Sequence, residues 1–323
     1  MTSIPAEFEL IYKHFRPLAG PDALGLGDDA AIFTAPAGRQ MVVAADAMVA
    51  GVHFLPDDPP ELVARKLLRT NLSDLAAMGA APFGYLLTVS VPRDTPDAWF
   101  AAFASGLAAD QAEYGITLLG GDTTSTPGPV SLSLTILGTV LPGTALRRTG
   151  ARPGDGVWVT GTIGDGALGL LAATGRLDDN DGFLAGRYRL PQPRLALGQR
   201  LAGIATAAMD VSDGLVQDLG HLCRGAGIAA TIEAALVPLS PAARVAVAAD
   251  GALLARCLGG GDDYELLLAV ADADAPALLE AAAACGVAVT RIGRFAAGPP
   301  DVAVCGPDGA PMTLPAGGWS HFA

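Results

Sequence analysis

Apolar residues follow two patterns along the chain, and these patterns predict its strands and helices. Short continuous apolar runs between turn residues are typical of buried strands, and apolar residues three or four positions apart are typical of helices. In the first half, the runs predict strands at Met41–Ala45, Tyr85–Val91, Ile116–Leu119 and Val130–Val140. The helical spacing there predicts helices at Glu7–Phe15, Pro59–Met78 and Pro96–Tyr114.

A turn-rich stretch near residues 141–152 separates this half from a second one. Beyond it, the same patterns predict strands at Gly156–Gly161, Ile228–Ile232, Leu266–Ala271 and Val287–Ile292. Helices are predicted from near Ala167, over Ala196–Ala205, from Gly214 to about Arg224, and at Ala275–Cys285. Both halves mix the two element types, and several neighbouring strands can pair antiparallel. We therefore predict two α+β domains, residues 1–141 and 142–323, rather than one doubly wound sheet.

Composition narrows the class of protein. The 323 residues are 51% hydrophobic, which excludes a disordered chain, while no apolar run reaches the roughly 20 residues of a membrane span. The 33 acidic and 20 basic residues give a net charge of −13, the wrong sign for a nucleic-acid binder. The N-terminus lacks a signal-peptide pattern, and the four cysteines form no C-x-x-C pair. We expect a cytoplasmic protein with reduced thiols.

The acidic residues are placed at strand ends and glycine turns rather than scattered. Those in such positions are Asp28, Asp29, Asp46, Asp74, Asp122, Asp155, Asp165, Asp210, Asp213, Asp262 and Asp263. Each alone is explained as a turn residue or a helix cap. Burying an unpaired carboxylate is costly, however, and the chain has only two lysines, Lys13 and Lys66. A converging set of carboxylates predicts Mg²⁺ and polyphosphate chemistry.

Known nucleotide and hydrolase motifs are missing. No G-x-x-x-x-G-K-[ST] loop is present, and Ser212 is not in a G-x-S-x-G turn. The turn Gly161–Gly166 is either a phosphate cradle or a tight strand-to-helix turn. The pair Arg147-Arg148 either forms salt bridges in the linker or binds an ATP phosphate. These two alternatives stay open at this point.

Seven ordered segments and the C-terminus together resemble one known family. The segments are GLGDDAAIF, AADAMVAGVHF, NLSDLAAMGAAP, GGDTTS, RRTGARPGDGVWVTGTIGDGALG, AMDVSDGLVQDLGHL and GGDDYEL, and the closing residues are GGWSHFA. They are similar to those of the thiamine-monophosphate kinases, a branch of the ATP-using superfamily that includes aminoimidazole ribonucleotide synthetase and selenophosphate synthetase. The resemblance runs from about residue 6 to residue 323.

This resemblance implies a fold and a reaction. The implied fold has two α+β domains of the aminoimidazole ribonucleotide synthetase type, and the N-terminal sheets of two subunits pair into a barrel across a homodimer. Residues 1–141 would bind ATP and Mg²⁺ and form the dimer, and residues 142–323 would complete the active site. The implied reaction is direct, in-line phosphorylation of thiamine monophosphate by ATP with several Mg²⁺ ions, giving thiamine diphosphate.

Site residues follow from the same resemblance. The implied metal ligands are Asp29, Asp46, Asp74, Asp122, Asp210 and Asp213. The implied ATP contacts are Gly121, Asp122, Arg148 and Ser212, and the implied substrate contacts are His53, Asp262 and Trp319. The chain departs from its relatives in two places. Ala44-Ala45 stands where they often carry Ser-Thr, which removes two hydroxyl ligands, and Asp262 stands where they often carry the longer Glu.

Two other functions are alternatives to the kinase. One is a sister ATP-using enzyme of the same superfamily; a selenophosphate synthetase would carry an early cysteine, whereas the first cysteine here is Cys223. The other is a non-catalytic sensor that binds a thiamine phosphate or a nucleotide. The sensor differs from the kinase in turnover, because it would bind its ligand without ADP release.

Overall fold

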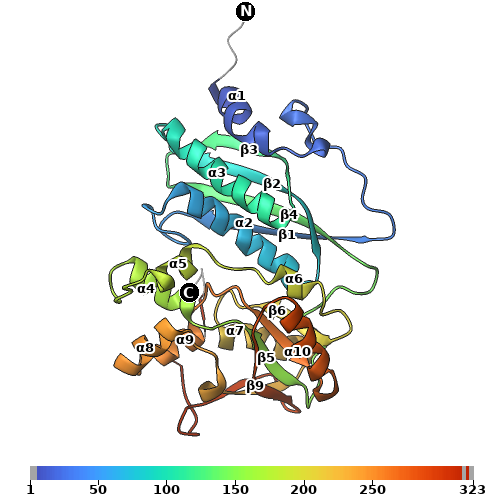
Figure 1. Cartoon of the computed structure of the whole chain (residues 1–323), viewed down its shortest axis with the longest axis vertical. Coiled ribbons are helices and arrows are strands. Elements are labelled where there is room, and N and C mark those ends of the chain that lie inside the picture. Colours follow the sequence, from blue (N-terminus) through green and yellow to red (C-terminus); the bar gives the residue numbers. More distant parts are fainter. Residues whose placement is uncertain (1–5, 315–317, 320–323) are drawn as a thin grey trace, which may run out of the picture. The chain divides into compact units, whose positions relative to one another are not determined.

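A computed structural model describes residues 6–314 and 318–319 of the chain. The chain divides into two compact units (Figure 1), one made of Met1–Leu75 and Ala81–Pro142 and the other of Ala76–Ala80 and Gly143–Ala323. Each unit is built on one mixed β-sheet with helices packed against it. No helix of the described residues is long and apolar enough to cross a membrane.

The first unit contains a four-stranded sheet with strand order β1-β4-β2-β3. Its strands are β1 Gln40–Val49, β2 Ala81–Val91, β3 Leu118–Ser125 and β4 Ser131–Val140. Strand β4 pairs antiparallel with β1 and β2, whereas β2 and β3 are parallel. The prediction ended the third strand at Leu119, but the pairing with β2 continues to Ser125. The neighbouring strand supplies backbone partners, with which glycines pair as well as other residues do.

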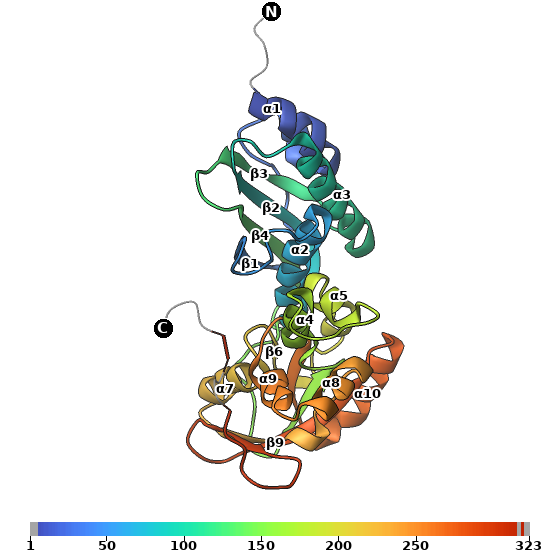
Figure 2. The ribbon, with the colours of Figure 1, turned by 90° about the vertical axis from the view of Figure 1, so that its left-hand side faces the viewer.

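Two long helices, α2 Pro60–Ala77 and α3 Asp97–Tyr114, lie on one side of this sheet (Figure 2). They bury the alternate side chains of the strands that face them, such as Leu87 and Leu134. The opposite face carries none of the helices described for this unit, and Val43 and Leu86 are exposed there. Both helices begin and end within two residues of the predicted bounds, because their apolar faces are long and regular.

The N-terminal segment consists of short helical pieces. They are α1 Ala6–Leu10, a π-helical turn Ile11–Phe15, and the 3-10 turns Arg16–Leu18 and Pro21–Leu26. The predicted helix at Glu7–Phe15 is therefore helical throughout but changes its winding at Ile11. Lys13 and the buried His14 both bind Asp97 at the start of α3, which ties this segment to the unit.

The second unit contains a six-stranded sheet with strand order β10-β7-β9-β5-β8-β6. Its strands are β5 Gly156–Thr160, β6 Ala205–Asp210, β7 Ala229–Glu233, β8 Leu266–Val270, β9 Val289–Ala296 and β10 Val302–Cys305. Only the β10–β7 pair is parallel among the strand pairs of the described chain in this sheet. Strand β8 is buried at every position, as its continuous apolar run predicts.

Helices surround this second sheet. They are α4 Asp165–Ala173, α5 Phe183–Arg189, α6 Leu195–Gly198, α7 Leu215–Ala226, α8 Pro241–Ala249, α9 Leu253–Gly259 and α10 Ala275–Ala284, with 3-10 turns at Ala234–Leu236 and Asp272–Asp274. The buried face of α7 packs in the main core with Met209, Leu267 and Phe295. A smaller core joins α4, α5, α8 and α9 through Leu168, Leu184 and Cys257.

One predicted element of this unit is wrong. The helix expected over Ala196–Ala205 is limited to α6, and the strand β6 begins at Ala205. Three of the five residues 205–209 are alanines, which suit either a helix or a buried strand, and pairing with β8 decides for the strand.

Candidate active site

The junction between β6 and α7 holds three of the predicted residues. Asp210 ends the strand and is buried, Ser212 and Asp213 follow in the loop, and Gly214 precedes the helix. Gly214 has a φ of +127°, and a Cβ there would lie 2.6 Å from the carbonyl oxygen of Gly259, so only glycine fits. The loop is therefore compact and turns the chain sharply from strand to helix.

Asp218, which lies in the first turn of α7, holds this loop in place. Its Oδ2 accepts hydrogen bonds from the backbone amides of Ser212, Asp213 and Gly214 at 3.0, 3.0 and 3.1 Å. The predicted site did not include Asp218. The available signal was an acidic residue in the first helical turn, which commonly caps free amides.

Three carboxylates meet at this junction. Burial, together with the charges of Asp210 and Asp213, raises the pKa of Asp218 to about 7. Such mutual repulsion marks a place that favours a cation, and carboxylate oxygens are the donors that Mg²⁺ prefers. Within the described ranges, no three His, Cys, Asp or Glu side chains are arranged to hold a metal ion by themselves. An ion here would complete its shell with water or phosphate oxygens, as Mg²⁺ commonly does.

The segment Gly261–Tyr264 lies directly against the loop. The amide of Asp262 donates to the carbonyl of Ser212 at 2.9 Å, and that of Tyr264 donates to Val211 at 2.8 Å. Asp262 and Tyr264 both have positive φ, 71° and 52°, which is rare for residues with side chains. Gly261 approaches so closely that a Cβ would lie 2.1 Å from the Ser212 carbonyl. The strained backbone thus places Asp262 next to Ser212.

Trp319 also reaches this loop. Its amide donates to the carbonyl of Asp213 at 2.9 Å, and its side chain is 52% exposed. The second unit therefore brings Ser212, Asp213, Asp262 and Trp319 together, although they are up to 107 positions apart in the sequence (319 − 212). The other residues of the closing motif, 317 and 320–323, lie outside the described residues.

Arg148 lies near α7. It is exposed, and together with the nearer Arg224 it lowers the pKa of His221 on that helix, although burial is the larger cause. Its carbonyl faces Gly225, where a Cβ would be 2.9 Å away. The guanidinium is thus on the α7 side of the second unit.

The turn Gly161–Gly166 has its amides occupied. Those of Gly164 and Gly166 donate to the carboxylate of Asp263 at 2.7 and 2.9 Å. Asp263 is buried, and burial raises its pKa. Because these amides already have an anionic acceptor, the geometry favours the tight strand-to-helix turn over the phosphate cradle.

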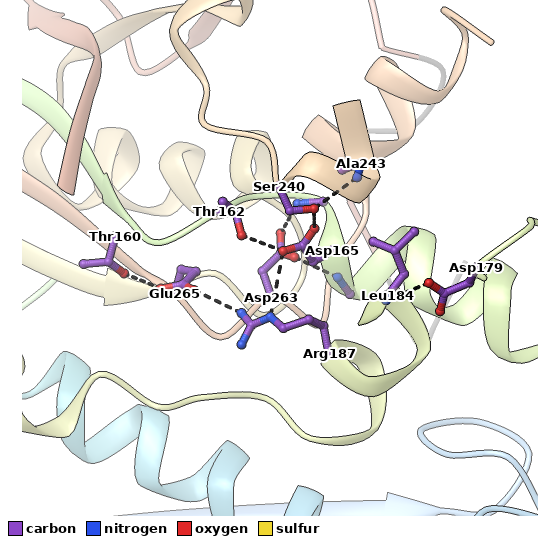
Figure 3. A network of polar contacts seen from close by, with 12 residues as sticks. Thr160, Thr162, Asp165, Asp179, Leu184, Arg187, Ser240, Ala243, Asp263 and Glu265 are labelled. Carbon is purple, nitrogen blue, oxygen red and sulfur yellow. Dashed lines mark hydrogen bonds and ion pairs between the residues drawn. The ribbon is translucent and has the colours of Figure 1, made fainter. Parts of the chain in front are cut away.

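A buried polar network extends from this turn (Figure 3). Glu265 accepts hydrogen bonds from the Thr160 hydroxyl and from the guanidinium groups of Arg187 and Arg194. Asp165 accepts from the hydroxyls of Thr162 and Ser240. Buried charges need such partners, so Asp263 and Glu265 anchor the strained segment on both sides of Tyr264.

The first unit holds the remaining predicted carboxylates. Asp46 on β1 is half-buried on the helix-covered face, and burial raises its pKa. Asp122 on β3 is exposed and shares the open face with its partner Thr88. Strands β4 and β2 lie between them, so this unit does not bring the two side chains together. Asp29 is exposed in the loop before β1, and Asp74 is half-buried near the end of α2.

Two further features of this unit concern predicted ligands. Gly121 has a φ of +155°, and a Cβ there would lie 1.7 Å from the Leu87 carbonyl, which requires glycine. One turn before Asp74, the buried side-chain oxygen of Asn71 accepts no hydrogen bond from the described residues, while its nitrogen donates to Leu67. A spare oxygen donor near Asp74 suits a hard cation or its water.

His53 lies in a turn that fixes its imidazole. Its Nδ1 accepts a hydrogen bond from the Val49 amide at 3.0 Å, so the neutral ring carries its proton on Nε2. The buried Lys66 donates to the His53 carbonyl at 3.0 Å. His53 is thus oriented as a donor through Nε2. Lys66 was not predicted as part of the site, because the position of a lysine in an amphipathic helix does not indicate which residue its side chain contacts.

Two family models and several relatives match the chain. The AIR synthase related protein N-terminal domain matches residues 27–140, and the AIR synthase related protein C-terminal domain matches residues 152–306. A thiamine-monophosphate kinase of Caulobacter vibrioides is 46% identical over 98% of this chain and 91% of its own.

Solved structures agree with these matches. The crystal structure of thiamine-monophosphate kinase from Stenotrophomonas maltophilia K279a has a TM-score of 0.84 and 42% identity, covering 95% of this chain and 98% of that one. AaThiL complexed with AMPPCP and TMP has a TM-score of 0.78 and 30% identity, covering 92% and 91%. The similarity therefore extends over both units.

Proposed function

This chain belongs to the thiamine-monophosphate kinase family, and from that premise we propose that it phosphorylates thiamine monophosphate with ATP to give thiamine diphosphate and ADP. The observation that carries the proposal is the full-length similarity to kinases, including a relative solved with AMPPCP and TMP. It is supported by the cluster of Ser212, Asp213, Asp262 and Trp319 in the second unit.

The phosphate group that accepts the phosphoryl group explains why the reaction needs no general base. The attacking atom is a phosphate oxygen, and a phosphate monoester is largely ionised at neutral pH because its second pKa is about 6. Catalysis then consists of aligning two anionic groups and neutralising their charge. A site rich in carboxylates and poor in lysine suits this task only when cations separate the carboxylates from the phosphates.

We propose that Asp29, Asp46, Asp74, Asp122, Asp210 and Asp213 hold Mg²⁺. When bound, Mg²⁺ would offset the negative charge of the phosphate groups during the transfer. The oxygen-only donor set and the spare Asn71 oxygen fit this ion. Asp218 sets the loop that presents Asp213, and it does so through backbone amides.

ATP and substrate contacts complete the proposal. Gly121, Asp122, Arg148 and Ser212 would contact ATP, and His53, Asp262 and Trp319 would contact thiamine monophosphate. The Nε2 hydrogen of His53 suits a phosphate oxygen, and an indole face suits a cationic heteroaromatic ring. In this proposal the domain of residues 1–141 binds ATP and Mg²⁺, and residues 142–323 complete the site.

A homodimer is part of the proposal. The open face of the four-stranded sheet carries exposed Val43 and Leu86, and a second copy would cover them by pairing its own sheet into a shared barrel. A cytoplasmic location is also proposed, since four unpaired cysteines suit a reducing compartment.

The direct test is turnover by the purified protein with ATP, Mg²⁺ and thiamine monophosphate. We expect thiamine diphosphate and ADP in equal amounts. Asp210→Asn should lower kcat by a factor on the order of 100 to 1,000, because it weakens the hold on the Mg²⁺ that is proposed to stabilise the transferring group. Asp178→Asn, at an exposed position, is the matched control and should leave kcat unchanged.

Two outcomes would contradict the proposal. Calorimetry that detects thiamine monophosphate binding with no ADP release at high enzyme concentration would indicate a sensor. An Asp210→Asn enzyme as fast as the Asp178→Asn control would remove Asp210 from the mechanism.

A further inference from the structure

We propose that Gln217 is a positioning residue that joins the segment Gly318–Trp319 to the loop Ser212–Gly214 (the Asp213 loop) and thereby sets the affinity for thiamine monophosphate. Gln217 lies in the first turn of α7, beside Asp218. The inference rests on the proposed function, because it assigns Gln217 a role in binding that substrate.

The carboxamide of Gln217 contacts both partners through one atom. Its Nε2 donates to Asp213 Oδ2 at 3.2 Å and to the Trp319 carbonyl at 2.8 Å. The Trp319 amide donates in turn to the Asp213 carbonyl at 2.9 Å. These three hydrogen bonds form a closed ring between a loop and a segment about 100 positions away. A primary amide suits this place because its nitrogen carries two hydrogens, one for each acceptor.

Gly318 allows the close approach. A Cβ at this position would lie 2.3 Å from Gln217 Oε1 and 2.5 Å from its Cβ, distances that side-chain atoms do not adopt. The backbone therefore passes directly over Gln217. A larger residue at position 318 would separate the segment from α7 and lengthen the two hydrogen bonds that Trp319 makes.

The ring of hydrogen bonds has a consequence for binding. The Trp319 indole is half-exposed, and its backbone is fixed to the same residue that is proposed to hold Mg²⁺. Gln217 thus places the surface for the heteroaromatic ring at a set distance from the charged part of the site. Without Gln217 the indole would have to be ordered when the substrate binds, which weakens binding.

The experiment compares Gln217→Ala and Gln217→Glu with the wild type in steady-state kinetics. We expect the KM for thiamine monophosphate to rise roughly tenfold in Gln217→Ala, with the KM for ATP within about twofold and kcat within about threefold. Gln217→Glu keeps the size but cannot donate and repels Asp213, so its loss should be at least as large. Gln199→Ala is the matched control, because Gln199 is exposed and donates only within its own helical turn among the bonds described.

Two more variants separate positioning from general damage. Gly318→Ala should raise the KM for thiamine monophosphate, since it displaces the segment and leaves the Gln217 side chain itself unchanged. In a Trp319→Ala background, Gln217→Ala should raise the KM by less than about twofold, because the surface it positions is gone. Titration of thiamine monophosphate in the presence of a non-hydrolysable ATP analogue should show the same ranking, and a Tm near that of the wild type would show that the variants fold.

The outcomes are distinct. If the wild type makes no thiamine diphosphate, the proposed function fails. If the wild type is active and Gln217→Glu has the KM of Gln199→Ala, the role of Gln217 is overturned. Equal rises in the KM for both substrates, or a full effect in the Trp319→Ala background, would also overturn it.

Discussion

At Asp218, a single carboxylate oxygen accepts hydrogen bonds from three consecutive backbone amides. The sequence signals only an acidic residue in a first helical turn, not this convergence. The amides belong to the loop that carries Ser212 and Asp213, so their orientation decides where both side chains point. Lys66 has a similar indirect role toward His53 in the first unit. Residues beside the predicted ligands therefore determine the geometry of the ligands themselves.

Replacing Asp218 should expose this dependence. Asp218→Ala leaves three amides at the start of α7 without their acceptor, and we expect a loss of roughly 3 kcal/mol in the free energy of unfolding. That corresponds to a fall in Tm of roughly 5–10 °C for a unit of this size, measurable by calorimetry. Asp218→Asn retains an accepting oxygen and removes a charge next to Asp210 and Asp213, so it should keep most of the stability.

Asp250→Ala is the control for this prediction. Asp250 is exposed and accepts a single amide, that of Ala252, so its replacement should change the Tm by only a few degrees. A Tm for Asp218→Ala equal to that of Asp250→Ala would mean that the three bonds contribute nothing to stability.

Among the elements, α4 depends on a residue far along the chain. Its first amides donate to Asp263, which lies beside the strained Asp262. Helix α5, which the sequence pattern did not predict, supplies Arg187 to the neighbouring Glu265. The long helices α2 and α3 and the buried strand β8 were predicted because their own apolar pattern specifies them. Helix α5 was not predicted, because it is short and long-range contacts such as the Arg187–Glu265 ion pair stabilise it.

Asp263 should also make stability depend on pH. Burial raises its pKa, and Asp165 adds to this, while the amides of Gly164 and Gly166 and the charge of Arg187 act in the opposite direction. The folded chain thus binds this proton more tightly than the unfolded chain, whose carboxyl has a pKa of about 3.9. The contribution to stability is complete below about pH 4 and declines as pH rises toward the folded pKa.

Asp263→Asn removes this titration. Between about pH 4 and pH 8, its Tm should fall less with rising pH than the Tm of the wild type, whatever its absolute value. Asp178→Asn, which is exposed, should follow the wild type. Parallel curves for the wild type and Asp263→Asn would show that the proton is not linked to folding.

For the whole molecule, the net charge of −13 and the open sheet face are connected to the proposed function. Part of the negative charge is proposed to bind Mg²⁺, and the remainder favours solubility. The exposed apolar residues of the first sheet are instead proposed to meet a second copy. The negative charge and the proposed interface are compatible because Val43 and Leu86 are uncharged.

Sedimentation should test the dimer. The wild type is expected at twice the chain mass of 32.5 kDa, and Val43→Lys should shift the equilibrium toward the single chain, because it buries a charge in the proposed interface. Val245→Lys is the control, since Val245 is 72% exposed on α8 in the other unit and should not affect the mass. A wild type at the mass of one chain, or a Val43→Lys protein identical to the control, would contradict the dimer.

The sequence alone was enough for the two-part α+β organisation, most of the long elements, and the family with its reaction. These follow from apolar periodicity and from short ordered motifs, and both are local properties of the chain. Only the tertiary structure decided that Asp263 occupies the amides of the Gly161–Gly166 turn, and that Gln217 and Asp218 hold the Asp213 loop. The physical reason is that a hydrogen bond needs its donor and acceptor within about 3 Å, and folding alone decides which distant residues come that close.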